Sequence, residues 1–313
     1  MTKVFIDGRA GTTGLQIEGS LWLREDISLI TLPEALKRDP EARRDAINRA
    51  DFVFLCLPDA AAKEAAAMVE NSHTRVIDPS TAHRTDPAWA YGFPELSPQH
   101  RKAIETAQFV ANPGCHATGF ISLVYPLVQM RILPADYPLC AHSLTGYTGG
   151  GKKMIQEYES PDREPEYDAP RHYGLNLSHK HIPEMIQVCG LRRKPIFCPI
   201  VSDYPQGMLV TIPLYFDMLP HGGSLEQLQK AYADFYAGQR NIHVAPVMGG
   251  DMIHGGCLGS NNVVGTNDLN IFVCGNETQA IVAAQFDNLG KGASGAAVQN
   301  LNIMMGVDEN LSL

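Results

Sequence analysis

Short apolar runs alternate with helix-like segments over the first third of the chain. The apolar runs are rich in β-branched and aromatic residues, which favours strands; they lie at residues 3–6, 27–32, 52–57, 75–78 and 108–111. Helices are expected directly after Gly14, over residues 33–50 and from Pro58 onward. The run at 52–57 is apolar throughout, as in a strand that is covered on both faces. This alternation predicts an α/β fold with a Rossmann-type, doubly wound parallel sheet.

The pattern changes after Cys115. Apolar positions at helical spacing predict a helix up to about residue 130, and a capping pattern predicts another over 224–236. The long polar stretch 157–177 is expected to be a loop. Strand-like runs stand at residues 196–201, 208–216, 263–264 and 269–274. We therefore expect an α+β second domain with a largely antiparallel sheet.

The composition is that of a globular protein and argues against a nucleic-acid-binding or membrane-spanning one. Hydrophobic residues make up 44% and charged residues 19% of the 313 residues, as in a globular protein of about two domains. The net charge of −9, with no basic stripe, argues against a nucleic-acid-binding surface. No apolar run approaches the roughly 18 residues of a membrane-spanning helix. An acid and a glycine follow the first apolar run before a signal-peptide core can form.

The seven cysteines are scattered along the chain, at positions 56, 115, 140, 189, 198, 257 and 274. None forms a C-x-x-C pair, so the sequence predicts neither a zinc site nor a disulfide framework, and no metal is expected. Their use fits a reducing compartment, and we expect the protein in the cytoplasm. A cysteine with a chemical role must therefore be identified from its surroundings.

A glycine turn follows the first predicted strand. Its glycines are spaced G-x-x-G-x-x-G rather than G-x-G-x-x-G, but they stand between a strand and an amphipathic helix at the start of the alternating pattern. Such a turn binds phosphate through backbone N–H groups at the helix start. The candidate cofactor residues are Gly8, Arg9, Gly11, Thr12, Thr13 and Gly14. The alternative is a tight strand–helix turn without a ligand.

The residues after the second predicted strand bear on the choice of dinucleotide. The acidic residue that usually selects the ribose of NAD is not evident near Leu32 and Pro33. Lys37 and Arg38 follow instead, and two cations favour NADP over NAD.

Cys115 stands in the segment 112–119, between a short strand and an apolar helix. A cysteine in the first turn of a helix is favoured as a thiolate, the nucleophilic form, by the helix dipole and unpaired N–H groups. Pro113 and Gly114 supply a sharp turn that can present the sulfur. The alternative is a small buried core residue.

A cysteine nucleophile needs a base, and the best candidates are His179 and His181. The two are expected to face opposite ways, so at most one of them is expected to meet Cys115. Metal binding or capping of the helix that begins near residue 183 are the alternatives. His116 is expected to point away from Cys115, because neighbours on a helix do not face each other.

Taken together, the glycine turn, the Cys115 segment and the segment 179–184 resemble the N-acetyl-γ-glutamyl-phosphate reductases, relatives of aspartate-semialdehyde dehydrogenase, in their shorter form. Three further stretches share the resemblance, which covers essentially the whole chain; they are residues 78–84, 91–96 and 286–297.

The resemblance implies the NADPH-dependent reduction of an acyl phosphate to a semialdehyde, in arginine biosynthesis. Cys115 would attack the acyl phosphate, expel phosphate and form a thioester, which hydride then reduces. His179 matches the base of the family, with His181 as the fallback. The family's stretches also assign Ser80 and Asn288 to the cofactor, and they assign Asn112, His181, Glu184 and Gln206 to the substrate.

One departure from the family concerns the substrate. Longer members carry an arginine in the segment that corresponds to 199–207, where this chain has Gln206. Another cation must then hold the substrate; the candidates are Lys152, Lys153, Lys180 and Arg84. The glycine-rich segment 145–151 either cradles the phosphate or forms a surface hairpin.

By the same resemblance the C-terminal helix returns to the first domain. We expect residues 1–114 and 287–313 to form the dinucleotide-binding domain, and residues 115–286 the catalytic, substrate and oligomerisation domain of a homodimer or homotetramer. Two other functions stay open at this point: aspartate-semialdehyde dehydrogenase, and a non-catalytic dinucleotide-binding redox regulator.

Overall fold

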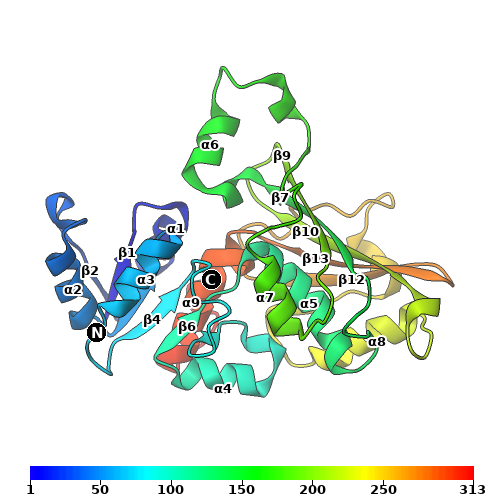
Figure 1. The fold of residues 1–313 in the computed structure, drawn as a ribbon, viewed down its shortest axis with the longest axis horizontal. Helices are drawn as coiled ribbons and strands as arrows, with labels where there is room; N and C mark the ends of the chain where they lie inside the picture. The colour runs from blue at the N-terminus through cyan, green and yellow to red at the C-terminus, as the bar shows by residue number, and fades with distance from the viewer. The chain divides into compact units, whose positions relative to one another are not determined.

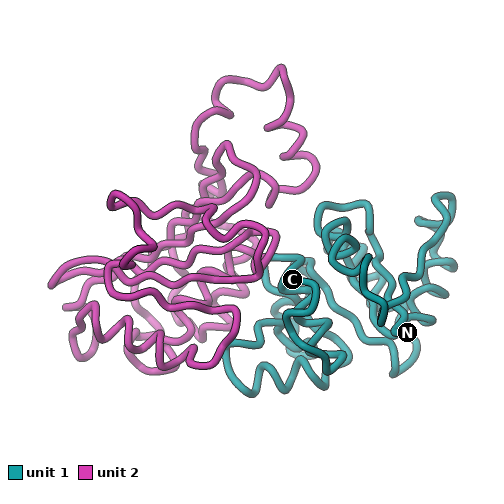
Figure 2. The backbone as a smooth tube through the Cα atoms, turned by 180° about the vertical axis from the view of Figure 1, so that it is seen from behind, with its two compact units in different colours: residues 1–114, 293–313 teal, residues 115–292 magenta.

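The computed structural model describes residues 1–313 and divides into two compact units (Figure 2). The first unit holds residues 1–114 and 293–313, and the second holds residues 115–292. The division thus falls after Gly114, as in the sequence analysis, and after Gly292 rather than after residue 286.

The first unit is built on a parallel sheet with the strand order β2-β1-β3-β4-β6-β5, which confirms the Rossmann-type prediction. The strands are β1 (Thr2–Asp7), β2 (Ile27–Ile30), β3 (Phe52–Leu55), β4 (Arg75–Asp78), β5 (Ala90–Tyr91) and β6 (Phe109–Ala111). The chain order reverses between β1 and β3, and in such sheets ligands bind beyond the carboxyl ends of the strands at that point.

Helices cover both faces of this sheet. On one face α1 (Thr12–Leu21), α4 (Pro98–Thr106) and the C-terminal α9 (Gly295–Met305) pack on alternate strand residues such as Val4 and Phe54. On the other face α2 (Pro40–Arg49) and α3 (Asp59–Ala67) pack on residues such as Phe5 and Val53. Burial on both faces explains why β3 is apolar throughout.

The second unit is built on a mixed sheet with the order β11-β12-β13-β10-β7-β9-β8. Four of its neighbouring pairs are antiparallel, whereas β11–β12 and β7–β9 are parallel. The largely antiparallel sheet is therefore confirmed. The strands are β7 (Cys140–Gly146), β8 (Arg171–His172), β9 (Ile196–Ser202), β10 (Met208–Tyr215), β11 (Ile242–Val244), β12 (Leu269–Gly275) and β13 (Gln279–Phe286).

Helix α5 (Cys115–Gln129) forms the centre of the second unit and is buried around most of its surface. It contacts β10 and β13 as well as α7 (Ile182–Cys189) and α8 (Leu225–Phe235) (Figure 1). The remaining helix, α6 (Gly151–Glu159), follows β7. Short helical turns complete the chain: η1 (Glu34–Leu36), η2 (Pro94–Leu96), η3 (Tyr147–Gly150), η4 (Pro165–Asp168), η5 (Phe216–Met218), η6 (Val247–Met252) and the π-turn η7 (Gly290–Ser294).

Three sequence predictions for the second unit need correction. Residues 263–264 form a turn rather than a strand, because the polar segment around them ends before β12 begins. The loop expected at 157–177 contains the end of α6, η4 and β8. The hairpin considered for 145–151 is instead the end of β7 followed by η3 and the start of α6. None of the helices has the length and apolar character that a membrane crossing requires.

Candidate active site

The glycine turn joins β1 to α1 and passes close to the end of β3. Gly8 has a φ of +82°, and a Cβ there would lie 2.1 Å from the carbonyl oxygen of Cys56. A Cβ on Gly14 would lie 2.9 Å from the carbonyl oxygen of Gly8. Helix α1 begins at Thr12, so Thr12 and Thr13 stand in its first turn, where the backbone N–H groups lack helical partners. Only glycine fits this turn at positions 8 and 14.

A cavity of about 350 Å³ opens beside the turn. Its wall runs from the end of β1 through residues 8–10 to the end of β2, and it includes Glu34, Lys37, Arg38 and Arg43. Arg43 is tied to the buried Asp7 at 2.8 Å, and Lys37 to Glu34 at 2.5 Å. That ion pair lowers the pKa of the Glu34 carboxyl. Arg38 makes no such ion pair, so its charge is available to an anion in the cavity.

Arg9 lies in the wall of the same cavity, but its guanidinium is already engaged. Its Nε atom lies 2.7 Å from Oε2 of Glu18, whose side chain is only 11% exposed. A turn that excludes side chains, a helix start and a cavity edged by Arg38 together fit the pyrophosphate and ribose of a dinucleotide.

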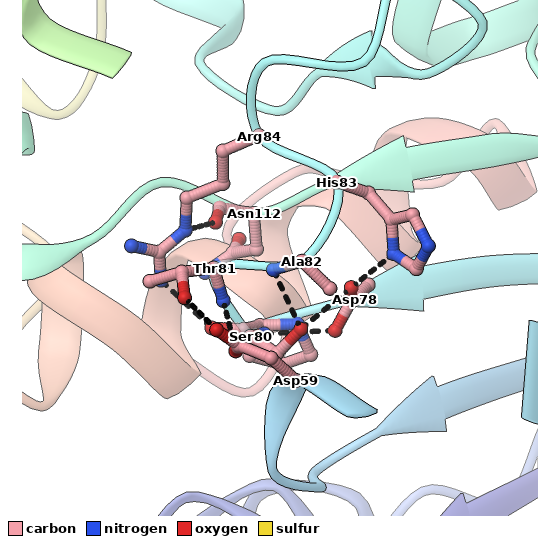
Figure 3. Close-up of polar contacts among 9 residues, drawn as sticks. Asp59, Asp78, Ser80, Thr81, Ala82, His83, Arg84 and Asn112 are labelled. Carbon is pink, nitrogen blue, oxygen red and sulfur yellow. Dashed lines mark hydrogen bonds and ion pairs between the residues drawn. The ribbon is translucent and has the colours of Figure 1, made fainter. Parts of the chain in front are cut away.

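Asp78, at the end of β4, organises the segment that contains Ser80 (Figure 3). Its buried carboxylate accepts hydrogen bonds from the backbone N–H and the hydroxyl of Ser80, both at 2.8 Å, and lies 2.6 Å from Nδ1 of His83. Thr81 donates to Asp59 through its backbone N–H at 3.0 Å. The hydroxyl of Ser80 is thus turned toward Asp78, and the segment 78–83 is held as a rigid turn.

Asn112 connects the residues before Cys115 to the rest of the first unit. It is fully buried, and its amide donates to the carbonyl of Ala293 at 3.0 Å and accepts from Asn300 at 2.9 Å. Its own carbonyl accepts from Nε of Arg84 at 2.9 Å (Figure 3). These contacts position the backbone at Asn112 and leave its amide turned into the protein.

Cys115 is the first residue of α5, at the helix start that the sequence analysis expected, and its side chain is half-buried. Its surroundings in the second unit are tightly packed. A Cβ on Gly292 would lie 2.9 Å from the Cβ of Cys115, so only glycine fits beside it. Burial, and after it the charge of Cys115, raises the pKa of Tyr173.

His116, the second residue of α5, is buried in the second unit. Its buried ring bridges two hydroxyls: Nδ1 lies 2.7 Å from Oγ of Ser143, and Nε2 lies 2.6 Å from the oxygen of Tyr173. Burial, followed by the charges of His179 and Lys180, lowers the pKa of His116 to about 3. This imidazole is therefore neutral near pH 7.

His179 and His181 both lie against His116, at ring-centroid distances of 5.2 and 5.6 Å, and 4.7 Å from each other. The expectation that they face opposite ways is wrong: both rings lie against His116, residues 180 and 181 form a turn, and residues two apart on an extended segment would in any case share a face. The backbone N–H of His181 donates to Nδ1 of His179 at 3.1 Å. In the neutral ring this hydrogen bond leaves the proton of His179 on Nε2.

A second cavity, of about 450 Å³, lies beside His179 and the start of α7. His179, Gln187 and Lys194 are among the residues that line it. Glu184 belongs to the first turn of α7 but is buried, and it is not one of the lining residues. The sequence analysis missed Lys194, because nothing in the sequence brings residue 194 next to residue 179.

Asn288 holds two turns of the second unit together. Its buried amide accepts from the backbone N–H of Gly207 at 2.8 Å and donates to Oγ1 of Thr148 at 3.2 Å. Gln206 lies in the same turn, and its amide reaches Asp287 at 3.4 Å. Asn288 thus fixes the glycine-rich segment against the segment that includes Gln206.

The cations considered for the substrate lie in different surroundings. Lys180 is near enough to His116 to affect its pKa, whereas Lys153 is 90% exposed and pairs with Glu157 at 3.8 Å. Arg84 is buried in the first unit, where two of its nitrogen atoms donate to backbone carbonyls. The sequence analysis also missed Lys291, a fully buried lysine within η7, next to Gly292.

The sequence of this chain matches known protein families over most of its length. Residues 115–288 match the family described as semialdehyde dehydrogenase, dimerisation domain, and residues 29–104 match semialdehyde dehydrogenase, NAD binding domain. A protein of Nostoc named N-acetyl-gamma-glutamyl-phosphate reductase 2 is 45% identical over 318 residues, which cover 99% of each chain. The N-acetyl-gamma-glutamyl-phosphate reductase of Burkholderia cenocepacia is 48% identical over 97% of each chain.

Solved structures share the fold at low sequence identity. Aspartate semialdehyde dehydrogenase from Francisella tularensis superposes with a TM-score of 0.72 at 13% identity, over 97% of this chain and 100% of that one. The enzyme of the same name from Candida albicans, solved with NADP, gives a TM-score of 0.67 at 16% identity over 99% of each chain.

Proposed function

Because this chain belongs to the semialdehyde dehydrogenase family, and within it to the N-acetyl-γ-glutamyl-phosphate reductases, we propose that it reduces N-acetyl-γ-glutamyl phosphate to N-acetylglutamate semialdehyde in arginine biosynthesis. The proposed reductant is NADPH and the proposed nucleophile is Cys115. The observation that carries the proposal is Cys115 at the first turn of α5, followed by a buried histidine that contacts two more.

The reaction begins at the sulfur of Cys115. Its thiolate attacks the carbonyl carbon of the acyl phosphate, the bond from that carbon to the phosphate oxygen breaks, and phosphate leaves with the electron pair. The substrate is then a thioester of Cys115. Covalent catalysis of this kind divides one difficult displacement into two easier steps. The start of α5 favours the thiolate, because the helix dipole and the free N–H groups there stabilise negative charge.

The first unit is the proposed cofactor domain. Gly8, Gly11, Gly14, Thr12 and Thr13 would hold the pyrophosphate at the start of α1, and Arg38 would meet the phosphate that distinguishes NADPH from NADH. When bound, the cofactor supplies the hydride that reduces the thioester.

Two residues are proposed to position the cofactor site indirectly, because their polar side-chain atoms form hydrogen bonds within the protein. Ser80 holds the turn after β4 through Asp78, and Asn288 holds the turn that contains Gly207.

The histidines are proposed to carry the proton of the Cys115 thiol. We propose that His179 is the base: its neutral ring takes that proton and becomes imidazolium, and it returns the proton to the sulfur when the carbon–sulfur bond breaks and the aldehyde leaves. His116 stays neutral and orients the cluster through Ser143 and Tyr173. His181 is the alternative proton carrier, since its ring contacts His179.

The cavity beside His179 is the proposed substrate pocket. Lys194 in its wall and Lys180 nearby supply positive charge for the carboxylate and phosphate of the substrate, in place of the arginine of longer family members. Three further residues are proposed to act on the substrate indirectly, by fixing backbone segments. Gln206 holds its turn through Asp287, Asn112 fixes the segment before Cys115 through Ala293, and Glu184 stands in the first turn of α7.

The match to a dimerisation domain supports self-association of this chain, as a homodimer or homotetramer. A cytoplasmic location fits a chain with seven unpaired cysteines. No nucleic acid or membrane partner enters the proposal.

The test is the reverse reaction. Purified protein should reduce NADP when given N-acetylglutamate semialdehyde, and the rate should require inorganic phosphate. Aspartate semialdehyde serves as the matched control substrate and should be used far more poorly. Equal use of the two semialdehydes would refute the proposed substrate. Repeated turnover of NADP without phosphate, beyond the single reduction per chain that forms the thioester, would refute the proposed reaction.

A further inference from the structure

A second group of sulfur and nitrogen ligands lies on the second unit, away from Cys115. Cys140 and His142 are two residues apart on β7 and therefore face the same side of the sheet. Cys198 on β9 is the register partner of His142, and His172 on β8 lies opposite Ile200, two residues along β9. The four side chains thus share one face across three neighbouring strands.

Three of these side chains lie close enough to share one ion, and Cys140 adjoins one of the three. The ligand atoms of His142, His172 and Cys198 all lie within 4.8 Å of one another. The sulfur of Cys140 lies 3.8 Å from Nε2 of His142. Zinc bonds to sulfur and nitrogen are about 2.0–2.3 Å long, so tetrahedral ligand atoms stand roughly 3.5 Å apart. The observed spacings of up to 4.8 Å are longer than this, so binding requires the side chains to rotate toward the ion.

We propose that Cys140, His142, His172 and Cys198 bind a thiophilic divalent metal ion of the zinc class. Two thiolates and two imidazoles form one of the standard tetrahedral sets for Zn²⁺, and no carboxylate is present to favour a harder ion such as Mg²⁺. The sequence shows no zinc motif because the ligands come from three strands, so their spacing of 140, 142, 172 and 198 has no local pattern.

The proposed ion would link β8 to β7 and β9 through the side chain of His172. This strand has only two residues, Arg171 and His172, and it forms the edge of the sheet. The next residue, Tyr173, donates to or accepts from His116 on the other side of the sheet, where Ser143 also lies. An ion on His172 would therefore restrain the segment that brings Tyr173 to the histidine cluster.

The experiment uses the full-length protein, freed of metal with a chelator and kept reduced, and titrates it with Co²⁺. Tetrahedral cobalt with cysteine ligands gives an intense thiolate-to-cobalt charge-transfer band and strong visible bands. We expect these bands to saturate at one ion per chain and to be displaced by Zn²⁺. His142→Gln and Cys198→Ser should each weaken binding by at least about tenfold, since even outer-shell partners of a metal contribute that much.

Two cysteine variants serve as matched controls. Cys274→Ser removes a half-buried thiol from β12 of the same sheet, and Cys115→Ser removes the proposed nucleophile. Both variants should retain the cobalt spectrum of the parent. The proposal is overturned if the charge-transfer band is absent, if it survives in Cys198→Ser and His142→Gln, or if it is lost in Cys115→Ser. It is also overturned if Cys140 and Cys198 are isolated as a disulfide that forms under the reducing conditions of the titration.

Discussion

The phenol oxygen of Tyr173 lies 2.6 Å from Nε2 of His116 and joins the residue after Cys115 to the segment that leads to His179. On its other side the ring of His116 lies 2.7 Å from the hydroxyl of Ser143. Both nitrogen atoms of a buried imidazole are therefore occupied. This arrangement gives His116 a fixed orientation and keeps it neutral, while its neighbours His179 and His181 remain the candidates for proton transfer.

A neutral, buried His116 makes stability depend on pH. Its pKa falls from 6.5 in the unfolded chain to about 3 in the folded protein, so the unfolded chain binds more protons between these values. The stabilising contribution is complete above pH 6.5 and is lost as the pH falls toward 3. Between pH 7 and pH 5 we expect this residue to remove about 2 kcal/mol from the free energy of unfolding, at 1.36 kcal/mol per pH unit.

Urea unfolding at the two pH values, in the parent protein and in His116→Asn, measures this contribution. The variant lacks the titrating ring, so its loss of stability between pH 7 and pH 5 should be smaller than that of the parent by the same amount. Identical pH dependence in the two proteins would contradict a depressed pKa at His116.

Gly8→Ala should abolish cofactor binding. The new Cβ would lie 2.1 Å from the carbonyl oxygen of Cys56, at a φ of +82°, so the turn must move away from β3. We expect the Kd for NADPH to rise by more than about tenfold, because the N–H groups that hold the pyrophosphate move with the turn.

Gly19→Ala is the matched control, since a Cβ there meets nothing within 4 Å on the exposed side of α1. It should leave NADPH binding unchanged and stabilise the helix by up to about 1 kcal/mol. Isothermal titration calorimetry gives the Kd of each variant. Unchanged binding in a folded Gly8→Ala protein would rule out the turn as the pyrophosphate site.

Arg38→Gln should reduce the preference for NADPH over NADH. The guanidinium lines the cavity beside the glycine turn without an ion pair, and a charged hydrogen bond to phosphate is worth about 1.5–3 kcal/mol. We expect kcat/KM for NADPH to fall by roughly 10–100-fold while the value for NADH changes little. Arg49→Gln, on the exposed side of α2 and paired with Asp45, should change neither value. A parallel fall for both cofactors would contradict a phosphate contact.

Lys194→Met should raise the KM for the acyl phosphate and leave kcat nearly unchanged. Lys194 lines the cavity beside His179, and its positive charge is expected to stabilise the bound substrate and the transition state equally. Loss of such binding raises KM and leaves kcat unchanged. Lys153→Met removes an equal charge from a 90% exposed position on α6 and should not change the KM. Steady-state kinetics of the three proteins compare these values. If Lys194→Met behaves as the parent, the cavity is not the substrate pocket.

Much of the first unit follows from its sequence, because its strands are apolar runs and the chain alternates regularly between strand and helix. The glycine turn and the start of α5 at Cys115 could be predicted for the same reason: both are local features, set by glycines, by Pro113 and by the apolar residues after them. The strands β7 and β13 were harder to foresee. One contains Cys, His, Ser and Thr, and the other is rich in alanine, so neither has the composition of a typical strand.

The contacts of the histidine cluster depend on long-range packing. Ser143, Tyr173 and His116 come from β7, from the segment after β8 and from α5, and only the sheet of the second unit brings them together. Side chains one apart on a helix diverge, but nothing in the sequence indicates that the ring of His116 meets Ser143 and Tyr173. Lys194 joins the same site through the packing of α7.

Covalent trapping at Cys115 tests the central claim most directly. The protein is incubated with N-acetylglutamate semialdehyde and NADP in the absence of phosphate, so that the thioester forms and only slow hydrolysis removes it; the acid-quenched protein is then digested and analysed by mass spectrometry. The account predicts an N-acetylglutamyl group on the peptide that contains Cys115, its release when phosphate is added before the quench, and no turnover in Cys115→Ser. An unmodified Cys115 peptide together with parental activity in Cys115→Ser would contradict the account.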